Sequence, residues 1–140
     1  MRKKICIIDG QGGGIGTTLV KYLKAAFGED VELIALGTNS IATSRMLKAG
    51  ANKGASGEAA VCRSAPQADL IVGPISVTWP NAMLGEVTPK MAEAIISSPA
   101  RKIVLPLSQE MVEIIGRSSE PLPHLVQQAV ALIKEVIKDV

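Results

Sequence analysis

Short apolar runs alternate with stretches of helical periodicity along most of this chain. Each of these runs has the length of a buried strand. The runs that predict strands are residues 5–8, 31–36, 68–73 and 102–106. Residues 51–56 suit either a short strand or an extended loop, and residues 111–115 are a candidate sixth strand.

Between the predicted strands, apolar residues recur at the spacing of a helix. The first helical pattern is clear from Thr17 onward, with Ile15 on its apolar face, and Gly28 ends it. Ser40 is placed to cap a second helix, which Gly50 ends.

Further helices follow in the second half of the chain. Residues 57–65 predict a short helix, and Thr88 caps the next one, with Pro89 at its first position. Residues 122–140 predict the last helix, whose apolar face comprises Leu125, Ala129, Leu132, Ile133, Val136 and Ile137. Strands that alternate with helices are typical of βαβ units. We therefore predict one Rossmann-like, doubly wound α/β domain over residues 1–140, in three layers, with a mainly parallel sheet of five or six strands.

A glycine-rich turn joins the first predicted strand to the first helix. Its glycines are Gly10, Gly12, Gly13, Gly14 and Gly16. Backbone N–H groups at such a turn and the dipole of the helix behind it both favour a bound anion. A turn that only lets helix and strand pack closely needs fewer glycines. We therefore favour phosphate or nucleotide binding.

The spacing of these glycines narrows the comparison. It lacks both the G-x-G-x-x-G fingerprint and the Lys of a Walker loop. It fits G-x-x-x-G-x-G and so resembles the cofactor loop of short-chain dehydrogenases. The Tyr-x-x-x-Lys pattern of that family is missing, because the single tyrosine, Tyr22, lies in the first predicted helix.

Asp9 stands where short-chain dehydrogenases usually have a threonine. A carboxylate there repels a phosphate unless it faces a ribose, a cation or the helix N-terminus. With Glu86 it would make a candidate magnesium pair, because Mg²⁺ can sit on one or two carboxylates plus substrate phosphates. Glu86 is explained equally well as a base or as a charge that helps fix the cap of the helix after it.

The second predicted strand ends without the acidic residue that holds the ribose hydroxyls in a typical NAD site. Thr38, Asn39, Ser40 and Arg45 follow it and could hold a 2′-phosphate instead, which favours NADP over NAD. The predicted cofactor-binding residues are Asp9, Gly10, Gln11, Gly12, Gly13, Gly14, Ile15, Gly16, Thr17, Thr38, Asn39 and Ser40. No catalytic residue is assigned, and whether the protein is an enzyme stays open.

Several runs together resemble DUF3842, a family of small bacterial proteins described as a domain of unknown function. These runs are residues 8–16, 35–39, 42–44, 47–52, 73–75 and 83–89. They span most of the chain. The resemblance implies a Rossmann-like fold and no activity, and it marks these polar loops, with the glycine turn, as shared features of the family.

Polar residues also gather in loops after other predicted strands. They are Ser76, Thr78, Trp79, Asn81, Ser108 and Gln109. Because ligands of open α/β sheets bind outside the carboxyl ends of the strands, we expect these loops and the glycine turn to converge on one crevice. His124 is interpreted as a solvated or capping residue. Cys6 and Cys62 are interpreted as small buried or half-buried residues.

Composition and charge argue against several classes of partner. The 140 residues are 47% apolar and only 2% aromatic, and the net charge is +2. So few aromatic residues leave little to stack single-stranded bases, and interspersed charges give no footprint for a duplex. Neither a signal peptide nor a membrane span is evident. We therefore expect a cytoplasmic protein without nucleic-acid or membrane partners.

Several functional hypotheses remain open at this point. The first is binding of a nucleotide or dinucleotide such as NADP or NAD. The second is a ligand sensor without catalysis, and the third is a magnesium-dependent enzyme acting on a phosphorylated metabolite. The apolar last helix and the absence of a separate substrate domain also favour a homo-oligomer.

Overall fold

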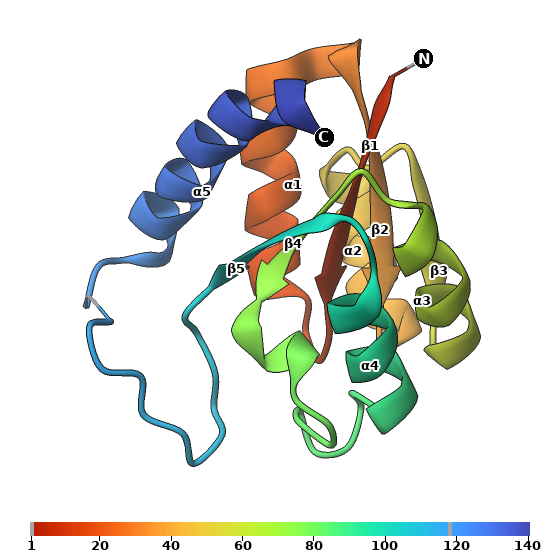
Figure 1. The fold of residues 1–140 in the computed structure, drawn as a ribbon, viewed down its shortest axis with the longest axis vertical. Helices are drawn as coiled ribbons and strands as arrows, with labels where there is room; N and C mark the ends of the chain where they lie inside the picture. The colour runs from red at the N-terminus through yellow and green to blue at the C-terminus, as the bar shows by residue number, and fades with distance from the viewer. Residues whose placement is uncertain (1, 118) are drawn as a thin grey trace.

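The computed structural model describes residues 2–117 and 119–140, and a parallel β-sheet forms its centre (Figure 1). The sheet has five strands in the order β3-β2-β1-β4-β5. The strands are β1 (Lys3–Asp9), β2 (Val31–Gly37), β3 (Lys53–Ser56), β4 (Leu70–Pro74) and β5 (Arg101–Leu105). All neighbouring pairs run parallel. The predicted doubly wound α/β fold is confirmed, with five strands, and the ambiguous residues 51–56 contain a short edge strand.

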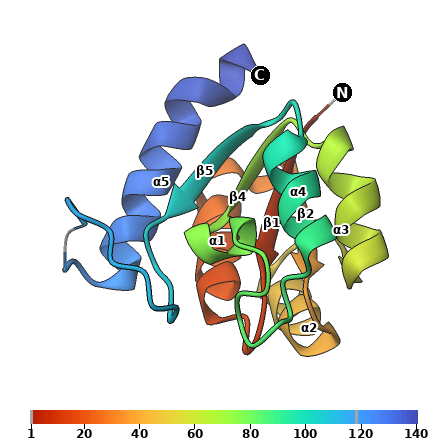
Figure 2. The same cartoon turned by 60° about the horizontal axis from the view of Figure 1, so that its bottom comes forward.

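Helices cover both faces of this sheet. They are α1 (Gly14–Phe27), α2 (Ser40–Ala49), α3 (Glu58–Ser64), α4 (Pro89–Ser97) and α5 (Leu122–Val136). Figures 1 and 2 show α1 and α5 on one side of the sheet and α3 and α4 on the other. The buried apolar residues of α2, Ala42 and Met46, belong to the same cluster as those of α1 and α5. The chain is thus a three-layer sandwich of helices, sheet and helices.

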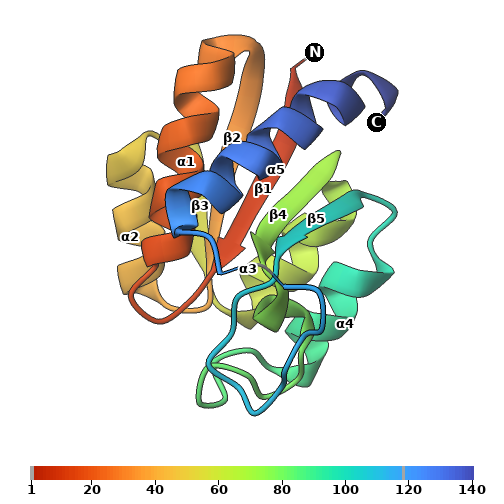
Figure 3. The same ribbon diagram turned by 90° about the vertical axis from the view of Figure 1, so that its left-hand side faces the viewer.

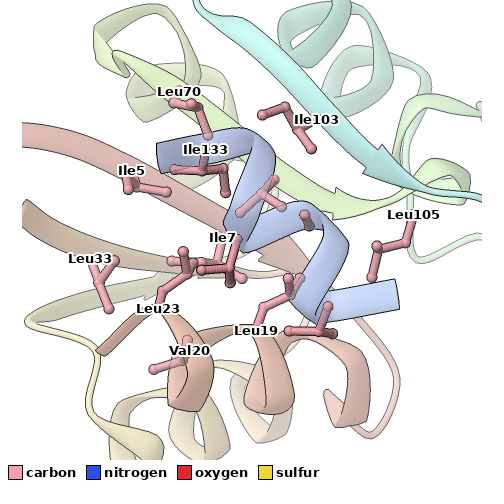
Figure 4. Packing of buried hydrophobic residues seen from close by; sticks show 14 of the residues in the cluster. Ile5, Ile7, Leu19, Val20, Leu23, Leu33, Leu70, Ile103, Leu105 and Ile133 are labelled. Atoms are coloured by element: carbon pink, nitrogen blue, oxygen red, sulfur yellow. The ribbon is translucent and has the colours of Figure 1, made fainter. Parts of the chain in front are cut away.

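Aliphatic side chains fill the core between the sheet and the face that carries α1 and α5. Ile5 and Ile7 of β1 are fully buried there against Leu19 and Leu23 of α1 and Ile133 of α5 (Figure 4). Strands buried on both faces consist of near-continuous apolar runs, and β1 could be predicted from the sequence for this reason. Because β1 lies at the centre of the sheet, its carboxyl end fixes the position of the glycine turn that follows.

The candidate sixth strand at residues 111–115 is wrong. The chain leaves β5 at Leu105 and continues as an irregular segment, in which Ile115 is 100% exposed. A strand needs a partner for its backbone hydrogen bonds. Among the described residues, no strand lies beside this segment. Figure 3 shows it running past the carboxyl ends of β4 and β5 before α5 begins.

Two helix starts also differ from the prediction. Helix α1 begins at Gly14, before Thr17, because Gly13 adopts a left-handed φ of 72° and its carbonyl accepts the first helical hydrogen bond, from Thr17 N at 2.8 Å. Helix α2 is capped by Asn39 and not by Ser40. The Asn39 side chain accepts a hydrogen bond from Ala42 N at 2.9 Å.

The last helix is shorter than predicted and presents a slightly different face. It ends at Val136 and continues as a single 3-10 turn, Ile137–Asp139. Leu132, which was assigned to the apolar face, is 43% exposed, whereas Val126 and Val130 are buried. Within the described residues, no helix is long and apolar enough to cross a lipid bilayer.

Candidate ligand-binding site

A cavity of about 400 Å³ lies at the carboxyl edge of the sheet, beside the glycine turn. Figure 2 brings this edge toward the viewer. The lining residues come from the end of β1, the start of α1, the loop after β4 and the segment after β5. They are Asp9, Gly10, Gln11, Gly12, Gly13, Gly14, Ile15, Ser76, Met83, Leu107, Ser108, Gln109, Glu110 and Arg117. The expected convergence with the glycine turn is observed for Ser76, Ser108 and Gln109, whereas Thr78, Trp79 and Asn81 do not line the cavity. Gly16 and Thr17, which were predicted to bind the cofactor, also lie outside its lining.

Four of the five glycines of the turn fall into two groups, and the fifth, Gly10, is covered by other side chains. Gly13 and Gly16 allow close packing, because a Cβ at Gly13 would lie 2.8 Å from Ala42 Cα and one at Gly16 would lie 2.5 Å from Met46 Sδ. Gly14 has nothing within 4 Å of the position of a Cβ, and Gly12 has only the Arg45 guanidinium, at 3.4 Å. Close packing against α2 thus explains Gly13 and Gly16. Gly12 and Gly14 face open space instead.

Asp9 fixes the two ends of the glycine turn through hydrogen bonds to its backbone. Its side chain is 3% exposed, and its two oxygens accept hydrogen bonds from Gly10 N at 2.8 Å and Gly16 N at 2.7 Å. Burial raises the pKa of Asp9, although the amides of Gly16, Gly10 and Ile15 oppose that shift, and the Glu86 charge adds to it. Of the three surroundings considered for this carboxylate, the structure shows the helix N-terminus, where negative charge is favourable.

Glu86 ties the glycine turn to the end of β2. Its Oε1 atom accepts hydrogen bonds from Gln11 N at 2.8 Å, Thr38 Oγ1 at 2.7 Å and Asn39 Nδ2 at 2.8 Å. Partial burial works to raise the pKa of Glu86, but these hydrogen bonds outweigh it and hold the pKa below its ordinary value. The cap of α4 is supplied by Thr88, as predicted, so Glu86 is free to act as this brace.

The predicted residues after β2 lie outside the cavity lining. Thr38 and Asn39 direct their side chains to Glu86, and Asn39 Nδ2 also donates to the Gln11 carbonyl at 2.9 Å. Ser40 is exposed at the start of α2. Arg45 donates from Nη1 to the Gly12 carbonyl at 2.6 Å, which supports the turn from the α2 side.

Polar groups without protein partners face the cavity from the other side. Ser76 is only 3% exposed, yet its hydroxyl makes no hydrogen bond to any described residue. Arg117 lies in the segment after β5 and has no ion pair within residues 2–117 and 119–140. No motif in the sequence marks Arg117, and the apolar run at residues 111–115 before it resembles a strand.

Metal ligands and reactive thiols contribute little to this site. The described part of the chain holds no group of three or more His, Cys, Asp or Glu side chains that could bind a metal ion. Any magnesium here would therefore depend on the phosphates of a ligand. Cys6 is buried in β1, and burial raises its pKa to about 12, which keeps the thiol unreactive. His124 lies at the start of α5, outside the cavity lining.

Comparisons with known proteins assign a family and no ligand. A solved universal stress protein in complex with cAMP is 18% identical, and the alignment covers 74% of this chain and 97% of that chain, with a TM-score of 0.42. So distant a likeness carries no argument about what this chain binds. A search of curated proteins found no match. The family model described as "Domain of unknown function (DUF3842)" matches residues 4–138. The chain therefore belongs to the DUF3842 family, as the polar loop runs of its sequence indicate.

Proposed function

We propose that the protein binds a small phosphate ester, and specifically a nucleotide, with a phosphate on the backbone amides of Gly12 and Gly14. The proposal rests on the observation that these two amides have no hydrogen-bond partner among the described residues. Both glycines are exposed beside the cavity. Unpaired N–H groups at the start of a helix favour an anion, and the absent Cβ lets a phosphate approach closely.

The rest of the cavity suits such a ligand. Its volume of about 400 Å³ falls within the range of small-molecule sites. Arg117 supplies a positive charge, and the Ser76 hydroxyl supplies a donor without a protein partner. The Asp9 carboxylate does not oppose the phosphate strongly, because the Gly10 and Gly16 amides already offset its charge.

The carboxylates of the cavity restrict the catalytic roles that can be proposed. The carboxylates that line the cavity are Asp9 and Glu110, and Asp9 has both oxygens engaged with backbone amides. General acid–base catalysis needs a group within reach of the reacting atoms and free to exchange a proton. Asp9 is therefore not the acid–base group, and Glu110 is the lining carboxylate on which an enzymatic role would depend. A hydride-transfer role would need only an oriented NAD or NADP, so these cofactors stay in the test panel.

The decisive experiment places a negative charge where the phosphate would lie. In Gly14→Glu, the new side chain enters open space at the first position of α1, where an acidic residue stabilises a helix. The variant should therefore fold at least as stably as the wild type while losing ligand binding. Ala59→Glu is the matched control, because it adds the same charge to an exposed position in the first turn of α3.

The readout is thermal stability with ATP, GTP, AMP, NAD, NADP, FMN or S-adenosylmethionine, each with and without Mg²⁺. A ligand at a hundred times its dissociation constant adds about 2.7 kcal/mol of stability, which is a shift of roughly 5–11 °C for a domain of this size. We expect at least one nucleotide to stabilise the wild type and Ala59→Glu but not Gly14→Glu. Equal shifts in all three proteins, or no shift in any, would overturn the proposal.

A further inference from the structure

The glycine turn is open on one side only. On the side of β2, the space above Gly10 is filled, because a Cβ there would collide with Thr38 Oγ1 and would lie 2.6 Å from Met83 Sδ. Glu86 Oε1 lies next to them, at 3.1 Å from the same point. On the opposite side, Gly14 has no neighbour within 4 Å. The protein thus closes one approach to the turn with its own side chains.

We call Thr38, Asn39, Met83 and Glu86 the β2-side plug. Glu86 fixes it through three hydrogen bonds, and Asn39 is held further because its side chain caps α2 and donates to the Gln11 carbonyl. Met83 is 8% exposed and so is packed in place. To vacate this space, the chain would have to break charge-assisted hydrogen bonds and release the cap of a helix.

A dinucleotide needs the space that the plug occupies. In doubly wound sheets it lies across the point where the strand order reverses, and one ribose reaches the end of the second strand. Here β1 lies between β2 and β4, so the two halves of such a ligand would lie over β2 and over β4. The β2 half meets side chains whose polar atoms are paired and an ionised carboxylate that repels a 2′-phosphate.

The β4 side, by contrast, offers polar side chains that line the cavity. Ser76, which is 3% exposed and whose hydroxyl has no partner among the described residues, lines the cavity from the turn after β4. Ser108 and Gln109 line the same cavity from the segment after β5. The Ser76 hydroxyl can donate to a ligand without giving up a hydrogen bond to the protein. We therefore infer that the ligand extends from the glycine turn toward the β4 side.

On the basis of the proposed function, we propose that the ligand is a single nucleotide and not a dinucleotide. Its phosphate lies on the amides of Gly12 and Gly14. Its sugar and base extend over Ser76 toward Ser108 and Gln109, away from the β2-side plug. Because the β2-side plug fills the space at Gly10, the second half of a dinucleotide would gain no contacts there.

The test compares AMP and nicotinamide mononucleotide with NAD, which joins these two nucleotides, and adds ATP and NADP. Affinities are measured by calorimetry on the wild type and on two variants. Ser76→Ala removes the unpaired hydroxyl without breaking a protein hydrogen bond, so its unfolding midpoint should equal that of the wild type. Ser40→Ala probes the β2 side, where the sequence predicted the ribose end of a dinucleotide.

We expect at least one of the single nucleotides to bind as tightly as NAD and NADP, within threefold. Ser76→Ala should weaken that binding at least tenfold, and Ser40→Ala should change it by less than twofold. Tenfold tighter binding of NAD or NADP than of every single nucleotide would overturn the inference, as would equal losses in the two variants.

The Gly14→Glu variant separates this failure from a failure of the proposed function. If NAD binds more tightly but Gly14→Glu abolishes its binding, the phosphates still lie at α1 and only the direction of the ligand is wrong. If no probe binds the wild type, or if Gly14→Glu binds as well as the wild type, the proposed function fails and this inference fails with it.

Discussion

Removing the Glu86 carboxylate should loosen the connection between the glycine turn, the end of β2 and the loop before α4. In Glu86→Ala, Gln11 N, Thr38 Oγ1 and Asn39 Nδ2 all lose the acceptor they share. A hydrogen bond contributes about 1 kcal/mol on average, and more when one partner is charged. Water can reach this partly buried site and replaces some of what is lost. We therefore expect a loss of about 3 kcal/mol in the free energy of unfolding.

Glu86→Gln is the informative partner of this variant. Its amide oxygen still accepts hydrogen bonds at the Oε1 position, so only the benefit of the charge is lost, about 1 kcal/mol. Glu93→Ala is the control, because Glu93 is an exposed residue of α4. It should stay within about 0.5 kcal/mol of the wild type.

Urea unfolding followed by circular dichroism measures all three variants. With an m-value of about 1.5 kcal/mol/M, a loss of 3 kcal/mol lowers the midpoint by roughly 2 M. The predicted order of stability is wild type, Glu86→Gln, then Glu86→Ala. If Glu86→Ala unfolds within 0.3 M of the wild type, Glu86 is not a brace, and the argument that the β2-side plug is fixed loses its basis.

The remaining predictions concern backbone strain, pH and assembly. Gly13→Ala should destabilise the protein by about 2 kcal/mol or more, because the φ of Gly13 is 72° and the new Cβ would meet Ala42. Gly14→Ala should be neutral or stabilising by up to about 1 kcal/mol, because its Cβ enters open space in a helix. The midpoints of urea unfolding compare the two variants. The pKa of Glu86 is lowered, so its contribution to stability is complete above its ordinary value of 4.5 and is lost as the pH falls through the folded-state value. The advantage of the wild type over Glu86→Gln should therefore shrink below about pH 4.5 in unfolding experiments, and an advantage that is constant down to pH 3 would contradict this. We expect light scattering at micromolar concentration to show a homo-oligomer. Leu132→Glu, on the exposed side of α5, should dissociate it. A monomeric wild type would contradict the hypothesis.

The sequence predicted the features that depend on local chemistry. The apolar run of β1 and the glycines after it placed a helix N-terminus at the carboxyl edge of a parallel sheet, and both are observed. The cap of α4 by Thr88 was also predicted, because threonine before proline is a strong local signal. The cap of α2 was misassigned by one residue, since Asn39 and Ser40 are both good capping residues and only the backbone decides between them.

Features that depend on contacts distant in sequence escaped prediction. Glu86 reaches Thr38 across 48 positions and Gln11 across 75, and no spacing rule relates these residues. The sequence left three surroundings open for Asp9: a ribose, a cation or the helix N-terminus. Only the positions of the Gly10 and Gly16 amides show that it is the helix N-terminus. At residues 111–115, a short apolar run resembled a strand. Whether such a run pairs depends on a neighbouring strand, which local sequence does not specify.

Amide NMR can detect whether a phosphate lies on the amides of Gly12 and Gly14. A ¹⁵N-labelled sample would be titrated with the nucleotide that stabilises the wild type most in the thermal panel. We predict that the amide resonances of Gly12 and Gly14 shift furthest and that Ser76 shifts with them, while Thr38 and Asn39 stay nearly fixed. Large shifts confined to other elements, with the Gly12 and Gly14 resonances unmoved at saturation, would contradict the proposed phosphate site.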